Sequence, residues 1–552
     1  MNLSRLLDPC FTPGAAAFRR IDPAAGSSRS WGPIAVEHCA GRIVLRIDPA
    51  VLVQLAFEAF RDVNFLFRSA HLEQWAAILD EPGSSANDRF VAAALLKNAA
   101  ISAEGVFPSC QDTGTAIVIG IKGEDVRTGG NDERALCDGV ARAYAECNLR
   151  FSQVAPSSMF EEANTRTNLP AQVDLAAAPS GAPGAGEYRF LFIAKGGGSA
   201  NKTFFFQETA ALLNERALEA FLREKIRSIG TAGCPPYHLA VVIGGTSAEA
   251  NLKALKLATA GALDRLPDLA AGGTADPDAV LRDSGWERRV LDLARDSGIG
   301  AQFGGSALAL DARVIRMARH AASLPISIGV SCSAHRNSLA RIAPDGAWLE
   351  DFDRHPVRFL ERALPVLEKA GQGAVRIRLD RPIREICRAL SAHPVGALVL
   401  LSGPLVVARD AAHARLACKL AEGAPLPSYF TECPVYYAGP ANTPKGRVIG
   451  SFGPTTAQRM DGYVRSFMTA GGSLVMLAKG NRSAQVTEAC RKFGGFSLGT
   501  IGGAAALIAR DHIVSERVVD LADLGFEAVR RIEVRDLPAF IVIDDKGNSL
   551  YA

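Results

Sequence analysis

The sequence predicts an α/β protein that consists of two domains. Three segments of the chain share one order: a short apolar run, a glycine-containing turn and a stretch of helical length. Alternation of strands and helices is typical of α/β architecture. In open α/β sheets, ligands gather at the loops that follow the carboxyl ends of the strands. These loops are therefore where we expect the chemistry.

Each of the three segments begins with an apolar run of strand length. The strands are expected at residues 238–243, 396–401 and 473–478. The turns that follow are Gly244-Gly245, Gly403-Pro404 and Lys479-Gly480-Asn481. The helices are expected at residues 249–263, at residues 408–420 and up to residue 492. Thr246 or Ser247 can cap the first helix, because their hydroxyls accept hydrogen bonds from the first turn.

A linker is expected over residues 346–370. The segment GAWLEDFDRHP, around residues 345–356, is rich in polar and aromatic residues and lies between longer apolar segments. The linker divides the chain into an N-terminal domain, residues 1–345, and a C-terminal domain, residues 371–552.

The composition excludes several classes of function. Apolar residues make up 48% of the 552 residues and charged residues 22%, as in ordinary globular proteins. The formal charge of +3 is too small to indicate a nucleic-acid or membrane surface, and no apolar run is long enough to span a bilayer. The eleven cysteines form no C-x-x-C pair and are expected to be mostly buried thiols of a cytoplasmic protein. An organelle transit peptide, mitochondrial in a eukaryote, is the alternative for the first twenty residues.

Three cysteines differ from the others in their setting. Cys110 lies in FPSCQDTGT, Cys234 in GTAGCPPYH and Cys332 in IGVSCSAHRN, each among small or turn-forming residues. Thiolates that converge from three loops can hold three corners of a [4Fe–4S] cluster and leave one iron open as a Lewis acid. The spacing matches no known ligand pattern, so three buried loop thiols remain the alternative.

Three cations follow predicted strands in the second half of the chain. They are Arg409 in VVARDAAH, Arg459 in TTAQRMD and Lys479 in AKGN. Arginine forks bind planar carboxylates with two hydrogen bonds, so this set favours a dicarboxylate ligand. The alternative for each is a solvated or helix-capping charge. Glycine-rich segments such as AKGGGSANK contain no phosphate-binding fingerprint, which argues against a dinucleotide-dependent oxidoreductase.

Taken together, these segments resemble the class I, iron–sulfur-dependent fumarate hydratases. The resemblance covers about residues 95–511 and rests on the motifs PSCQDTGT, LRFSQVAPSSMFEEANTRTNLPAQ, IAKGGGSANK, VVIGGTSAEANLK, GPLVVARDAAHARL, YYAGPANTPKGRVIGSFGPTTAQRMD and AKGNRS. It implies an N-terminal α/β domain that binds a [4Fe–4S] cluster and a C-terminal swivelling β/β/α-type domain that supplies much of the substrate pocket. It also implies a homodimer.

The resemblance assigns residues to three groups. The implied cluster ligands are Cys110, Cys234 and Cys332. The implied substrate-binding residues are Gln111, Arg150, Gly198, Arg409, Arg459 and Lys479. The implied catalytic residues are Thr455, Asp112, His320 and Lys479.

The expected reaction is the reversible addition of water to fumarate, which gives L-malate. Thr455 is the expected base at C3, with Arg459 and Lys479 stabilising its anion, while Asp112 and His320 handle the proton on the oxygen side. A purely orienting role for Asp112 is the alternative. Mesaconate and tartrate are the alternative substrates for such a hydro-lyase. The alternative outside enzymes is a protein that senses iron or oxygen and binds nucleic acid.

Overall fold

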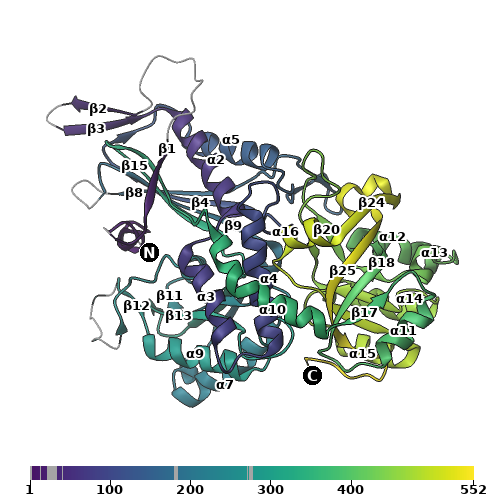
Figure 1. Cartoon of the computed structure of the whole chain (residues 1–552). Coiled ribbons are helices and arrows are strands. Elements are labelled where there is room, and N and C mark those ends of the chain that lie inside the picture. The colour runs from purple at the N-terminus through teal and green to yellow at the C-terminus, as the bar shows by residue number, and fades with distance from the viewer. Residues whose placement is uncertain are drawn as a thin grey trace.

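The chain folds into an N-terminal part with two main sheets and a C-terminal part with a third, which lie side by side (Figure 1). The computed structural model describes residues 3–12, 14–21, 34–39, 42–178, 184–269, 272, 276 and 278–551. In Figure 1 the N-terminal part runs from purple to teal and the C-terminal part from green to yellow. None of the helices described is both long and apolar enough to cross a bilayer.

A six-stranded sheet organises the first half of the N-terminal part. Its spatial order is β1 (Phe18–Ile21), β16 (Gly346–Glu350), β15 (Asn337–Ala343), β9 (Tyr188–Lys195), β4 (Thr115–Gly123) and β8 (Gln172–Ala178). Helices α2 (Pro49–Phe65) and α5 (Asp132–Glu146) pack together and bury their apolar faces in the core on one side of this sheet. Helix α2 begins where Asp48 accepts a hydrogen bond from the Ala50 amide and Pro49 occupies the first turn.

A five-stranded sheet forms the other half of the N-terminal part. Its order is β10 (Phe204–Glu208), β14 (Leu324–Ser331), β11 (Tyr237–Gly245), β13 (Ala309–Arg319) and β12 (Val280–Arg282). Every residue of the central strand β11 is buried, which explains its continuous apolar sequence. Helices α7 (Glu215–Ile229) and α9 (Ser284–Asp296) cover one face, and α8 (Ala248–Thr259) packs on β11 and β14.

The third sheet, in the C-terminal part, contains a closed ring of strands. The spatial order is β17 (Val375–Arg378), β18 (Leu398–Val407), β19 (Val435–Tyr436), β22 (Val475–Ala478), β23 (Phe496–Gly499), β25 (Val529–Ile543) and β24 (Ile513–Asp520). Strand β25 pairs antiparallel with both β23 and β18, so β18, β19, β22, β23 and β25 close on themselves. Its helices are α11 (Ile383–Ser391), α12 (Asp410–Ala421), α13 (Ser428–Glu432), α14 (Asp461–Thr469), α15 (Ala484–Phe493) and α16 (Ala505–Leu507).

Smaller elements complete the fold. The remaining helices are α1 (Leu3–Leu7), α3 (Ser69–Asp80), α4 (Ala86–Ser102), α6 (Gly197–Ala200) and α10 (Leu360–Gly373). Three small sheets join β2 (Ile34–Cys39), β3 (Arg42–Ile47) and β5 (Val126–Arg127); β6 (Val154–Pro156) and β7 (Glu162–Asn164); and β20 (Ala438–Pro440) and β21 (Phe452–Pro454).

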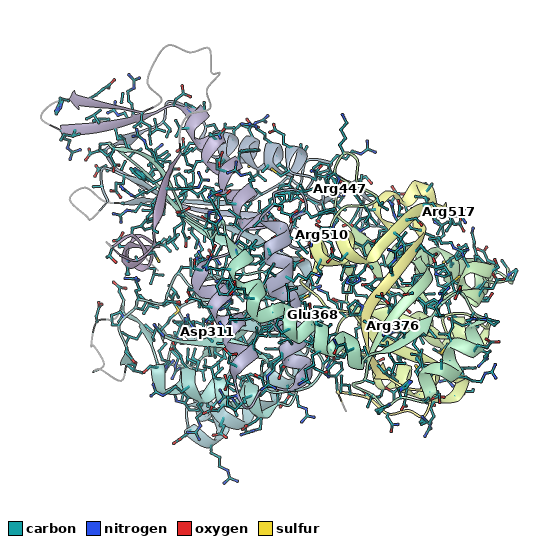
Figure 2. All side chains as sticks on the ribbon, in the orientation of Figure 1. Asp311, Glu368, Arg376, Arg447, Arg510 and Arg517 are labelled. Carbon is teal, nitrogen blue, oxygen red and sulfur yellow. The ribbon has the colours of Figure 1, made fainter. Side chains whose placement is uncertain are left out.

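The two parts share one hydrophobic core, in which α4 packs on α3, α10 and the C-terminal α16, and Phe90 of α4 contacts Phe540 of β25. Within this core the buried Asn98 of α4 donates to the carbonyls of Ser109 (3.0 Å) and Gly503 (3.2 Å) and accepts from the Leu507 amide. At the surface of the same junction Arg510, labelled in Figure 2, pairs with Glu104. The shared core and these bonds fix the loop before Cys110 relative to the C-terminal part.

The three strand–turn–helix units are present, with one correction. Strands β11 and β22 and helices α8, α12 and α15 occupy the expected segments, and Ser247 caps α8 by accepting from the Ala250 amide. The prediction of a turn at Gly403-Pro404 is wrong, because β18 continues through both residues to Val407 and pairs with β25 along this stretch. A register shift between Leu401 and Gly403 and a φ of 126° mark the glycine within the strand.

Residues 346–370, expected to form a linker, contain regular structure. They begin with β16, which pairs with β1 and β15 of the six-stranded sheet. They end within α10, which contains Pro365 in its first half and packs on α3 and α4. In the structure these residues therefore pack on elements of the N-terminal part.

Candidate active site

The three cysteines singled out from the sequence lie close enough to interact electrostatically. Cys110 lies between α4 and β4, Cys234 between α7 and β11, and Cys332 directly after β14. Cys110 and Cys234 are buried and Cys332 is half-buried. The Ser333 amide donates to the Cys234 carbonyl at 3.0 Å, which joins two of the three loops.

The surroundings of the cysteines match the needs of an iron–sulfur cluster. Cluster sulfurs accept hydrogen bonds, and three buried polar atoms beside these thiols, Ser109 Oγ, Ser333 Oγ and Arg336 Nε, have no partner. A Cβ at Gly502 would lie 2.4 Å from Cys234 Sγ, so glycine is needed for this close approach. Cys234 itself has φ of 62°, a left-handed conformation that costs a non-glycine residue on the order of 1–3 kcal/mol.

The described residues contain no group of three or more His, Cys, Asp or Glu side chains able to hold one metal ion. Thiolates that each bind a different iron of a cluster need not surround a single ion. The donor set of three thiols is also that of iron–sulfur ligation.

Neighbouring cations oppose the effect of burial on these thiols. Burial raises the pKa of Cys234 to about 11, while Lys479 acts to lower it. The Lys479 ammonium donates to Cys234 Sγ at 2.8 Å. Burial also raises the pKa of Cys110, against the effect of Arg336. Because metals bind the thiolate form, Lys479 and Arg336 favour the state that a cluster requires.

A polar cavity of about 200 Å³ lies between the two parts of the chain. Its N-terminal wall contains Gln111, Asp112, Arg150, Gly197, Gly198 and Asn201, and its C-terminal wall contains Arg409, Gly453, Thr455, Thr456, Arg459 and Lys479. The structure therefore gathers in one cavity all the expected substrate-binding residues together with Thr455, Asp112 and Lys479.

Asp112 is the carboxylate of this cavity. Burial acts to raise the pKa of Asp112, but Arg150, Arg336 and Lys479 outweigh burial and hold the pKa below its ordinary value. The Gly197 amide donates to Asp112 Oδ2 at 2.8 Å, and Arg150 Nη2 lies 3.5 Å from Oδ1. Asp112 is therefore ionised and can only accept hydrogen bonds.

The cations of the cavity outnumber their partners. Burial and the neighbouring Arg150 lower the pKa of Arg409 to about 10, although Glu527 lies 3.4 Å from its Nε. Arg459 forms an ion pair with Asp410. A negatively charged ligand relieves this repulsion, so the cavity is suited to a small anion with two carboxylates.

Thr455 follows β21 at the centre of the C-terminal wall. Its amide donates to the Tyr437 carbonyl at 2.8 Å, and its carbonyl accepts from the Lys479 amide at 3.1 Å. Arg459 Nη1 lies 3.4 Å from the Thr455 hydroxyl. Across the cavity, a Cβ at Gly198 would lie 3.1 Å from Lys479 Nζ, so this glycine leaves room for the lysine.

His320 is not brought to this cavity within one chain. It lies exposed on the turn between β13 and β14, where its Nδ1 accepts from the Ala322 amide at 3.2 Å. The whole of β14, eight residues long, separates this turn from Cys332.

Arg336 is a site residue that the sequence pattern did not identify. It is buried, donates to Asn64 Oδ1 at 3.1 Å and interacts electrostatically with Cys110, Cys332 and Asp112. Its position four residues after Cys332 is the only sequence signal, and a single arginine in a loop is not distinctive.

Comparisons with known proteins agree over almost the whole chain. The sequence model of fumarate hydratase (Fumerase) matches residues 53–341, and that of the fumarase C-terminus matches residues 346–552. Fumarate hydratase 2 of Leishmania major is 52% identical over 513 residues, 93% of this chain and 88% of that protein. Fumarate hydratase class I, aerobic, of Escherichia coli (strain K12) is 51% identical over 519 residues, 94% of this chain and 92% of that protein. A putative L(+)-tartrate dehydratase subunit beta of Methanocaldococcus jannaschii is 32% identical over 161 residues, 28% of this chain and 83% of that one.

The lowered pKa of Asp112 predicts a pH-dependent contribution to stability. The unfolded chain has an aspartate pKa of about 3.9, so the contribution is complete above that pH and is lost as the pH falls through the lower folded-state value. We expect Asp112→Asn to reduce the free energy of unfolding near pH 7, and the difference from wild type to shrink below about pH 4. Urea unfolding followed by circular dichroism measures this, with the exposed Asp138→Asn as a control that changes little. A difference that does not vary with pH would contradict it.

Proposed function

The chain belongs to the class I fumarate hydratase family and is a hydro-lyase that interconverts fumarate and L-malate, and we propose that it does so with a [4Fe–4S] cluster held by Cys110, Cys234 and Cys332. The observation that carries the proposal is the cavity in which cations from both parts of the chain meet beside Cys234. When bound, the cluster supplies a Lewis acid at the corner that no cysteine holds.

The arginines bind the two carboxylates of the substrate. Arg150 lies on the N-terminal wall, and Arg409 and Arg459 lie on the C-terminal wall, so a dicarboxylate is held from both sides. The same guanidinium groups stabilise the negative charge that grows on one carboxylate when the C3 proton leaves. Truncation of one such preorganised donor typically costs ~3–4 kcal/mol of transition-state stabilisation.

Thr455 removes the C3 proton and returns it in the reverse reaction. A hydroxyl is a weak base, and the Arg459 guanidinium 3.4 Å away favours its anion. The Lys479 ammonium lines the same cavity and adds positive charge. Asp112, ionised and fixed by the Gly197 amide, accepts the proton on the oxygen side.

We also propose that the chain is divided into an N-terminal cluster domain and a swivelling C-terminal domain. The closed ring of β18, β19, β22, β23 and β25 with surrounding helices supports a swivelling β/β/α-type C-terminal domain, which begins near residue 371. The expected cluster domain, residues 1–345, contains all three cysteines.

We also propose a homodimer in which His320 serves the cavity of the second copy. Within its own chain His320 is exposed at the end of β13, on the far side of β14 from Cys332. An active-site role for this histidine is therefore compatible with the geometry when a second subunit supplies it.

The first test is turnover after anaerobic reconstitution with iron and sulfide. Loss of the absorbance of the conjugated double bond is expected to be fastest with fumarate and slower with mesaconate, and dehydration of tartrate is expected to be slow. Because the open iron is accessible, activity should fall in air and recover with Fe(II) and a thiol. The absence of an iron chromophore, or unchanged turnover in Cys234→Ser, would overturn the proposal.

Replacing the proposed base tests the acid–base assignment. Thr455→Ala is expected to lower kcat by about 10²–10⁴-fold and to abolish exchange of the malate C3 proton with solvent, with unchanged iron content. Thr456→Ala is the matched control, because the neighbouring Thr456 also lines the cavity but has no assigned proton transfer. Normal C3 exchange in Thr455→Ala would remove Thr455 from this role.

A hybrid dimer tests where His320 acts. Chains that carry Thr455→Ala and chains that carry His320→Ala are co-expressed with different tags, and the hybrid is isolated through both tags. If His320 serves the second copy, one of the two sites keeps both native residues and about half of the wild-type activity remains. A hybrid as inactive as the two single variants would place His320 in its own chain's site, and full activity of the His320→Ala homodimer would remove His320 from the reaction.

A further inference from the structure

Two buried imidazoles and one half-buried imidazole lie together beside the cysteine loops, and none has a part in the proposed reaction. His71 belongs to α3, His238 to β11 and His335 to the loop after β14. Their ring centroids are 3.8 Å (His238–His335), 5.0 Å (His71–His238) and 5.5 Å (His71–His335) apart. His238 follows Cys234 by four positions and His335 follows Cys332 by three.

The hydrogen bonds of His71 have only one possible direction. His71 Nε2 lies 2.7 Å from the Ser333 carbonyl, which can only accept, so Nε2 carries a proton. Burial, with the neighbouring His238, lowers the pKa of His71 to about 3, so the ring is neutral and its Nδ1 has no proton. His238 Nε2, 3.1 Å from His71 Nδ1, is therefore the donor.

The opposite nitrogen of His238 also carries a proton. His238 Nδ1 lies 2.8 Å and 2.9 Å from the two oxygens of Asp311. Burial acts to raise the pKa of Asp311, but His238 and Arg313 outweigh it and hold the pKa well below the ordinary value. An ionised carboxylate only accepts, so Nδ1 donates and His238 is an imidazolium. Figure 2 shows Asp311 in the N-terminal part, on the side away from the C-terminal domain.

The chain of bonds runs from Asp311 through His238 and His71 to the Ser333 carbonyl. Ser333 follows Cys332, and its amide donates to the Cys234 carbonyl at 3.0 Å. A carbonyl oxygen accepts a hydrogen bond but passes no proton onward, so the chain is not a path for protons to the cavity. Its effect is instead to fix the peptide that joins two cluster-ligand loops.

These loops need such a restraint. Cys234 has φ of 62° and His335 has φ of 38°, both in the left-handed region that non-glycine residues avoid. The His335 amide donates to the Cys332 carbonyl at 2.9 Å, which closes the turn after the ligand. A strained turn persists only where its surroundings determine it.

A role in packing alone does not account for the buried charge. Apolar side chains of similar volume usually replace a buried ion pair without loss of stability. Here the polar groups are connected from end to end, and the neutral His335 ring lies against the cationic His238 ring at an interplanar angle of 38°.

We propose that Asp311, His238 and His71 are positioning residues that hold the Cys234 and Cys332 loops in the geometry for cluster binding and so slow the loss of iron. This inference rests on the proposed function, because it assumes that these cysteines bind the cluster. It concerns no step of the reaction itself, and its readout is iron retention rather than turnover.

The experiment compares two substitutions of His71 in the anaerobically reconstituted protein. His71→Gln places an amide nitrogen near the position of Nε2 and can still donate to the Ser333 carbonyl, whereas His71→Leu fills the space without a donor. Iron release to a ferrous chelator is expected to be about 10–100-fold faster in His71→Leu, while His71→Gln stays close to wild type. Asp311→Asn, which cannot hold the imidazolium, is expected to release iron faster as well.

His512→Leu is the control, because His512 bonds to the Arg535 carbonyl in the C-terminal part, away from the cysteines. Wild-type iron release in both His71→Leu and Asp311→Asn, or equal acceleration in His71→Leu and His71→Gln, would overturn the inference. If His71→Leu does not fold, as judged by its thermal midpoint, the comparison of Asp311→Asn with wild type decides alone. A wild-type protein that binds no iron would overturn the proposed function, which is a distinguishable result.

Discussion

The contact between the Lys479 ammonium and Cys234 Sγ is the interaction on which the rest of the site depends. It joins a turn after β22 of the C-terminal ring to a loop of the N-terminal part, so neither part alone contains the cavity. The shared core around α4 holds the two walls at the distance that this contact requires. Gln111, which donates to the Pro454 carbonyl at 3.0 Å, makes a second connection of the same kind.

Charge balance explains why the cavity remains specific for a small dianion. Positive groups converge from both walls, and burial makes their repulsion stronger than it would be at the surface. Asp112 offsets part of this charge and is itself kept ionised by it. A neutral molecule of the same size would leave the remaining cations without partners, whereas two carboxylates satisfy them.

Local sequence patterns predicted those strands and helix caps that depend on residues close together in the sequence. Residues 239–243 of strand β11 are an apolar run because the whole strand is buried, and Ser247 is a cap because its side chain bonds within one turn. The end of β18 could not be predicted in this way, since its pairing partner β25 lies more than a hundred residues further along the chain. Arg336 and the paired His238 were missed for the same reason, because their roles arise only when distant loops meet. The cysteines and the cavity residues were identified through long motifs, and the position of His320 relative to them required the folded chain.

The closure of the C-terminal ring by β25 has a consequence for biosynthesis. On the ribosome, β25 emerges after β18, β19, β22 and β23, so the ring stays open until all of its other strands have been made. Lys479 follows β22 of this ring, so its contact with Cys234 belongs to a wall that is incomplete until β25 has been added. The cavity between the two parts of the chain is therefore completed only after the last long strand has been synthesised.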